Sequence, residues 1–246
     1  MFYLLLGCFG SAEPPKSDLV EYARCKETEE CGPELQCLGS QFKPVGDEDW
    51  ATGTCMRDVA QHKALVDTLH ARLAEAVSAA ESADPNLPLS CSTVSAEGNH
   101  YIVESNWARA VAAGTEDAPH YIGAGVPSEF NGRLGPSATM SDSDLVGTGR
   151  QVQWLLAKRY LGVSVEDELR FPEVDFQNAT YVPGHVRARV YLYDTESKTL
   201  VCGGLPFEGV AKKAETPSPA QDLQNSSRDS LKDALAHMVP ELTFYL

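Results

Sequence analysis

The 246-residue sequence predicts an α+β fold, in which helices pack on an antiparallel sheet centred on a hairpin at residues 181–211. Apolar and polar residues alternate from Val186 to Tyr193, the period of two expected of a strand with one buried and one wetted face. A polar turn at 194–198 and an apolar run from Thr199 complete the hairpin pattern. Helical periodicity lies on both sides of the hairpin, and clustered cysteines near the N-terminus predict an additional small disulfide-rich module.

The length suits one sizeable domain with a small satellite. We expect three parts: a lipobox-like segment and tether at 1–17, the disulfide-rich module at 18–58, and the α+β domain at 59–246.

The net charge is −15, from 35 acidic and 20 basic residues. Up to Asp58 there are 11 acidic and 5 basic residues, so both parts of the chain are acidic, and no run of Lys or Arg occurs. A phosphate backbone or an anionic lipid surface would be repelled by this charge. The composition therefore argues against nucleic-acid binding and is typical of an acidic, soluble surface.

The N-terminal stretch is short and apolar, and no stretch of the chain reaches the roughly 18 apolar residues of a membrane-spanning helix. Leu5-Leu6-Gly7-Cys8 resembles a bacterial lipobox, in which signal peptidase cuts before a cysteine that then carries lipid. The resemblance implies lipidation of Cys8, with residues 11–17 as a flexible tether. Only seven residues precede Cys8, none of them basic, so the alternative is a frayed apolar tail with a stray cysteine.

Cys25, Cys31, Cys37 and Cys55 are separated by gaps of five, five and seventeen residues. A polar segment of this size cannot bury a core, so we expect cross-links to hold it together. The spacing differs from that of a zinc ribbon and no histidine lies within the cluster, which favours disulfides over zinc. Of the three possible pairings we favour Cys25–Cys37 with Cys31–Cys55.

The spacing of this quartet resembles the small Dickkopf-like or colipase-like modules that recur in secreted bacterial lipoproteins. The resemblance covers about one sixth of the chain and rests on spacing alone. It implies an exported, envelope-associated protein whose module is a spacer or a contact surface.

Cys91 and Cys202 lie in apolar surroundings of the main domain, and we predict a cross-link between them. It would close a loop of about a hundred residues and add about 2–4 kcal/mol of stability. Two buried free thiols are the alternative, and a cysteine nucleophile is a weaker one. Six cysteines in disulfides would place the chain outside the cytoplasm.

The periodicity of the main domain predicts helices, strands and links in alternation. In order, we expect a helix at 58–82, a strand at 100–103, a helix at 105–113, an irregular loop at 115–135, a helix from Ser141 or Ser143 to about 158, a strand at 160–165, an acidic link at 166–179, the hairpin, a linker at 212–221 and a last helix from Ser226 or Ser227. His62 and His70 lack the i, i+4 spacing of a metal site, and we expect both to be solvated or half-buried.

The sequence contains no GxSxG, HExxH, P-loop or CxxC motif. We therefore assign no catalytic residue, metal or cofactor. The leading hypothesis is an exported, lipid-anchored, non-catalytic protein of the bacterial outer membrane or cell surface that binds a protein partner or has a structural role.

Two other functions stay open. One is an extracytoplasmic hydrolase with a site assembled from scattered residues such as His120, His185 and the acids of the 115–135 loop. The other is a protease inhibitor that uses residues 38–50 of the disulfide-rich module.

Overall fold

The predicted hairpin is present in the structure, a computed structural model, as strands β8 (His185–Asp194) and β9 (Thr199–Val210). Asp194 shapes the turn between them, because its Oδ1 accepts hydrogen bonds from the backbone N–H groups of Glu196 (2.9 Å) and Ser197 (3.4 Å). A side chain that bonds the backbone two and three residues ahead is the polar turn chemistry that the sequence predicts here.

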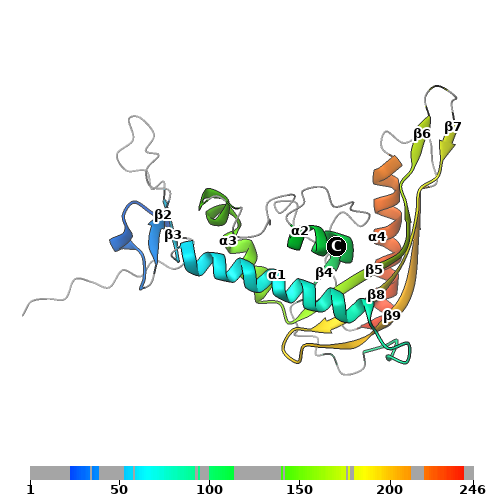
Figure 1. Cartoon of the computed structure of the whole chain (residues 1–246), viewed down its shortest axis with the longest axis horizontal. Coiled ribbons are helices and arrows are strands. Elements are labelled where there is room, and N and C mark those ends of the chain that lie inside the picture. Colours follow the sequence, from blue (N-terminus) through cyan, green and yellow to red (C-terminus); the bar gives the residue numbers. More distant parts are fainter. Residues whose placement is uncertain are drawn as a thin grey trace, which may run out of the picture. The chain divides into compact units, whose positions relative to one another are not determined.

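The structure describes residues 23–33, 35–38, 53–57, 59–91, 94, 100–113, 140, 142–175, 177, 180–211 and 219–240. The chain divides into two compact units, Met1–Gln61 and His62–Leu246. The remaining elements in chain order (Figure 1) are β1 (Arg24–Cys25), a 3-10 helix (Thr28–Glu30), β2 (Gln36–Leu38), β3 (Gly53–Met56), α1 (Val59–Glu81), β4 (His100–Glu104), α2 (Ser105–Ala113), α3 (Asp142–Leu156), β5 (Tyr160–Arg170), β6 (Glu173–Asp175), β7 (Thr180–Val182) and α4 (Pro219–Met238).

The large unit is built on a four-stranded sheet in the order β4-β5-β8-β9. β5, β8 and β9 pair antiparallel, while β4 runs parallel to β5. The predicted α+β class is confirmed, with one refinement: the hairpin supplies an inner strand, β8, and an edge strand, β9, of a mixed sheet.

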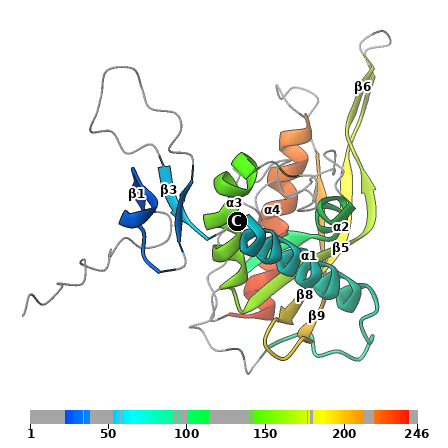
Figure 2. The same cartoon turned by 60° about the vertical axis from the view of Figure 1, so that its left-hand side comes forward.

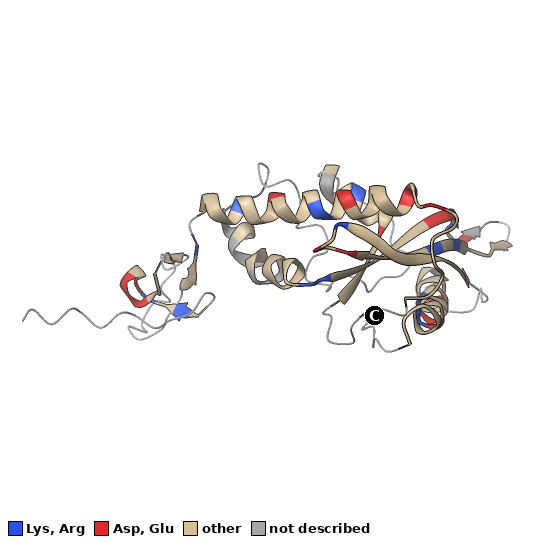
Figure 3. Ribbon diagram, turned by 90° about the horizontal axis from the view of Figure 1, so that it is seen from below, with Lys and Arg blue, Asp and Glu red and all other residues tan. Residues whose placement is uncertain are grey.

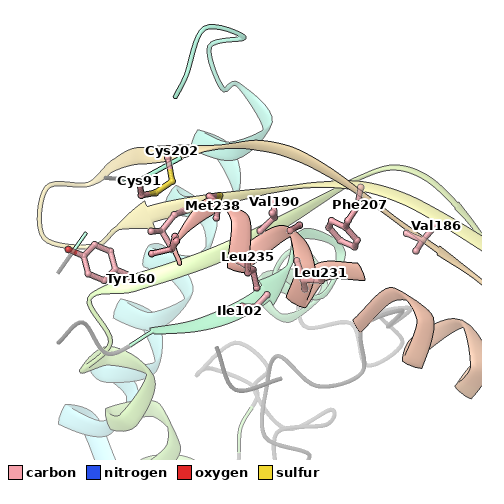
Figure 4. Close-up of a cluster of buried hydrophobic side chains, with 14 of the residues drawn as sticks. Cys91, Ile102, Tyr160, Val186, Val190, Cys202, Phe207, Leu231, Leu235 and Met238 are labelled. Carbon is pink, nitrogen blue, oxygen red and sulfur yellow. A yellow bond between two sulfur atoms is a disulfide. The ribbon is translucent and has the colours of Figure 1, made fainter. Parts of the chain in front are cut away.

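One face of the sheet carries the apolar core. Val186, Val190 and Leu192 are fully buried there, opposite Leu235 and other residues of α4 that are also fully buried. Figure 4 shows the side chains of α4 directed at the strands, with the Cys91–Cys202 disulfide at one end of the cluster. The alternation in β8 and the apolar stripe of the last helix thus meet, as the sequence predicts.

α4 approaches β9 very closely at Gly209. A Cβ on Gly209 would lie 2.1 Å from Ser227 Oγ and 2.7 Å from Ser227 Cα. Only glycine leaves room for the helix backbone at this position. Farther back in β9, Gly204 adopts φ +84° as the extra residue of a bulge, a conformation that glycine reaches without strain.

The opposite face of the sheet is covered along part of its length. Figure 3 shows α1 on one side of the sheet and α4 on the other. Tyr191 and Tyr193 of β8 are buried on the α1 side, whereas Arg187 and Arg189 of the same row are 61% and 43% exposed. One half of this face is therefore interior and the other half is surface.

Two expectations about the chain's path are wrong. β5 continues to Arg170, and β6 and β7 form a second hairpin, so residues 166–179 are largely strand rather than a link. Two of the charged side chains that suggested a link, Asp167 and Glu168, project from the uncovered half of the sheet, where a strand can be polar. α4 begins at Pro219, well before the predicted start, since Ser226 and Ser227 bond to Val210 N–H and to the helix backbone instead of capping the helix.

The small unit contains a three-stranded sheet in the order β1-β3-β2. Its core cluster is three buried cysteines, Cys25, Cys31 and Cys55, with Leu35 and Cys37 packed against them. The structure joins Cys25 to Cys37 and Cys31 to Cys55, which is the favoured pairing. The disulfides themselves therefore form most of this core.

Candidate functional site

The feature that most resembles a site is the uncovered half of the sheet, which we call the charged end. It comprises Asp167 and Glu168 of β5, His185, Arg187 and Arg189 of β8, and Glu208 of β9. The period of two in β8 places its three basic positions on one face. Figure 3 shows acidic and basic positions close together in this part of the sheet.

Arg187 lies at the centre of a row of charges that crosses three strands. It is paired in register with Glu168 on one side and with Glu208 on the other. Its Nε donates to Glu208 Oε1 at 2.8 Å, and its Nη1 lies 3.6 Å from Glu168 Oε2. Opposite charges in facing positions stabilise neighbouring strands, so the guanidinium is held between two carboxylates.

His185, at the start of β8, is paired in register with Arg170 and Val210 and contacts this row diagonally. Its Nε2 lies 2.8 Å from Glu168 Oε1. The hydrogen bond from His185 is the main reason that the pKa of Glu168 lies below its usual value, and the charge of Arg187 adds to the effect. Glu168 is therefore a carboxylate at neutral pH and cannot serve as a proton donor.

Arg189 forms a second group with Asp167 and Tyr191. A bulge between Glu166 and Glu168 turns Asp167 toward it, and Arg189 Nη2 and Nε bond the carboxylate at 2.7 and 3.0 Å. Arg189 Nη1 also donates to Tyr191 Oη at 2.9 Å, and the bond to Asp167 raises the pKa of the guanidinium. The two-bond geometry fixes the orientation of this arginine.

A hollow of about 210 Å³ lies at the charged end. Its lining residues come from three strands: Glu168, His185, Val186, Arg187, Glu208 and Val210. The side chains of Glu168, Arg187 and Glu208 are all more than half exposed. Water therefore screens these charges, and the hollow lacks the enclosure that strengthens electrostatic catalysis.

The covered half of the same face differs in character. Tyr193 lies there near Glu75 and Arg72 of α1, and burial raises its pKa to about 12. Burial likewise raises the pKa of Tyr101 on β4. Both phenols stay protonated at neutral pH, which fits a role in packing α1 against the sheet.

The structure places the predicted site residues as follows. Cys91 is bonded to Cys202, and the four other cysteines are bonded as described above. The sulfurs of Cys25, Cys31 and Cys37 lie within 4.8 Å of one another because the two disulfides pack together, and disulfide sulfurs are not thiolate ligands.

Of the predicted histidines, His185 lies in the hollow, while His62 is only 1% exposed. The expectation that His62 is solvated or half-buried is therefore wrong. It faces inward because it shares the helical stripe of Val66 and Leu69, whereas His70 is half-buried. Cys8, His120, the 115–135 loop and residues 39–50 lie outside the described residues.

Sequence reasoning identified His185 but missed the acidic partners of the charged end. The alternation in β8 predicts its polar positions, but the local pattern predicts a link at Asp167 and Glu168 and gives Glu208 no role in a site. The signal that could have found them is a strand pairing between 160–170 and 185–194, which brings opposite charges into register.

Fold and surface together define a class: a disulfide-linked α+β protein with a charge-paired, open sheet surface. Comparisons with protein-family models, curated proteins and solved structures found no match. The disulfides indicate an oxidising, extracytoplasmic compartment. Among the described residues, no helix is long and apolar enough to span a bilayer.

Proposed function

We propose that this chain is an exported, lipid-anchored, non-catalytic protein of the bacterial outer membrane or cell surface, and that it binds a protein partner through the charged end. The observation that carries the proposal is the arrangement of Arg187 between Glu168 and Glu208, with Arg189 held by Asp167. These side chains form a pattern of alternating charges, held by ion pairs, on an exposed sheet surface.

A pattern with both signs of charge favours a protein as the partner. A polyanion such as nucleic acid or an anionic lipid surface selects a continuous basic patch, whereas each arginine here has an acidic neighbour. Protein surfaces carry charges of both signs, and complementary patterns determine which partner docks and how fast. The net charge of −15 adds repulsion toward polyanions.

Binding is favoured over catalysis for a chemical reason. A catalytic acid or base needs a pKa tuned toward the working pH, through burial or an unbalanced neighbour. Glu168 is shifted the other way, and it is exposed. The hydrolase alternative keeps one supporting observation, the contact between His185 and Glu168 within the hollow.

Anchoring and export are tested by non-reducing peptide mass spectrometry on protein isolated from its native host. We expect a diacylated Cys8 at a processed N-terminus and six cysteines in three disulfides. An intact Met1 with seven free thiols would contradict both export and anchoring.

Partner binding is tested with two variants of equal charge. Arg187→Gln with Arg189→Gln alters the charged end, and Lys198→Gln with Lys232→Gln removes the same charge from exposed positions elsewhere. In crosslinking on intact host cells, we expect wild type and the control to capture one partner, and the arginine variant to capture roughly tenfold less. This difference should shrink at high salt, because salt screens the charges that the variant has lost. Equal capture by both variants would refute the role of the charged end.

A further inference from the structure

β9 is an edge strand of the four-stranded sheet. An edge strand presents a row of unpaired backbone N–H and C=O groups, which is a template for pairing with another chain. β9 has 12 residues, and the two halves of its outer edge are covered in different ways. The way in which this edge is covered therefore determines whether two copies of the chain can associate.

The C-terminal half of β9 is covered by its own sequence and by α4. Pro206 has no N–H group and cannot extend a ladder on that side. The backbone N–H of Val210 donates to Ser226 Oγ at 3.0 Å, and Ser227 lies directly against Gly209. These contacts belong to the helix that builds the main core, so they do not depend on the strap or on the Cys91–Cys202 bond.

The N-terminal half of β9 is covered differently, by residues 84–91, which we call the strap. The backbone N–H of Gly203 donates to Pro88 O at 2.9 Å, so the strap occupies an outward-facing donor of the edge. The side chain of Leu89 lies beside Gly204. At its end, Cys91 is bonded to Cys202 and its N–H donates to Met238 O at 2.9 Å (Figure 4).

Packing alone holds the strap weakly. Most of residues 84–90 are exposed, and Leu89 is 58% exposed, whereas Cys91 is only 7% exposed. A segment that buries so little apolar surface gains little from the hydrophobic effect. The disulfide is therefore the main attachment of the strap to β9.

We infer that the strap is a covalently locked cover for the N-terminal half of the edge of β9, and that without the Cys91–Cys202 bond this half pairs with the same half of β9 in a second copy. The partner is a second copy because each copy then offers the same free edge, and two such edges form a self-complementary antiparallel pair about a two-fold axis. The inference is independent of the charged end, which lies on a face of the sheet rather than at this edge.

The test compares two chains that each lack one disulfide. Cys91→Ala with Cys202→Val removes the lock and keeps apolar side chains in the core, and Cys25→Ala with Cys37→Ala removes a disulfide from the small unit. Light scattering after gel filtration should show a concentration-dependent dimer for the first variant and a monomer for wild type and the second. A folded first variant that stays monomeric at every concentration would overturn the inference.

A second variant covers the case in which the first does not fold. Pro88→Gly with Leu89→Ser leaves the disulfide and the core intact and loosens only the cover. The rate of hydrogen exchange at the Gly203 amide should then rise at least roughly tenfold, while the rate at Val190 on the inner strand β8 should not change. An unchanged rate at Gly203 would show that the strap does not shield this edge.

Discussion

The two units of this chain use disulfides in opposite ways. In the small unit, the cysteines are the core: Cys25, Cys31 and Cys55 form the buried cluster. In the large unit, the Cys91–Cys202 bond lies at the end of an apolar core that includes Leu192, Leu235 and Met238. A cross-link replaces hydrophobic burial in the first unit and supplements it in the second, so the same chemical change should have different consequences.

The largest effect is expected where the cross-link stands in for a core. Cys31→Ala with Cys55→Ala should unfold the small unit, because loss of a native disulfide costs a small secreted domain about 2–5 kcal/mol, most of what such a domain has. Amide exchange in β1, β2 and β3 should lose its protection, while the melting transition of the large unit stays unchanged. Persistent protection of these amides would mean that packing, and not the disulfides, holds this unit.

In the large unit, a comparable loss of stability requires the truncation of a core residue. Leu235→Ala removes a fully buried side chain of α4 and should cost about 2–5 kcal/mol in urea unfolding, through lost burial and the cavity left behind. Leu89→Ala is the matched control, because Leu89 is 58% exposed and should change stability by less than about 0.5 kcal/mol. Similar losses in both variants would contradict the assigned core.

A smaller loss of stability is expected at the point where α4 lies closest to β9. Gly209→Ala should cost about 1–3 kcal/mol, because the new Cβ meets Ser227 and forces α4 away from β9. Adding Ser227→Ala should not restore the loss, since the backbone Cα and N of residue 227 also lie within 2.8 Å of that Cβ. Thermal unfolding measures the stability of both variants. If Ser227→Ala restored the full stability, the clash would involve only the Ser227 hydroxyl, and the predicted backbone contact would be wrong.

The smallest effect is a pH dependence at the hairpin turn. Burial raises the pKa of Asp194, but hydrogen bonds from Arg159 and from the backbone N–H groups of Glu196 and Ser197 outweigh it and hold the pKa below its usual value. A lowered folded pKa stabilises the fold above the unfolded pKa of about 3.9, and this stabilisation is lost as the pH falls through the folded value. Asp194→Asn should therefore be about 1 kcal/mol less stable than wild type at pH 6 and nearly equal to it near pH 2.

The control for this pH dependence is Glu196→Gln, whose exposed side chain lies 3.3 Å from Arg159. Screening by solvent should leave its difference from wild type small at every pH. Chemical denaturation at a series of pH values measures both. A difference between Asp194→Asn and wild type that grows toward low pH would reverse the assigned sign.

Much of the fold follows from local sequence signals. The alternation from Val186 to Tyr193 and the turn at Asp194 specify β8 and its hairpin, because side-chain period and turn chemistry are both properties of neighbouring residues. The helical stripe of Leu69 and Leu73 specifies α1 in the same way.

The features that the sequence does not predict depend on contacts between residues that lie far apart in the sequence. Residues 166–170 look like a polar link until they are paired with 185–189, and Ser227 looks like a helix cap until it lies against Gly209. The charged end was hidden for the same reason, because Glu168, Arg187 and Glu208 become one row only after three strands are aligned. No local pattern encodes strand register between distant segments.

The parallel pairing of β4 with β5 also affects the order in which the strands fold. His100 pairs with Tyr160 across a long intervening segment, whereas β8 and β9 are joined by a turn of four residues. Contacts between residues that are distant in sequence form slowly, because the chain must lose conformational entropy before the contacts stabilise it. Hairpins, in contrast, close within microseconds. The first strand of the sheet to leave the ribosome should therefore be the last to join it, and until then the folding chain exposes the side of β5 that β4 will cover.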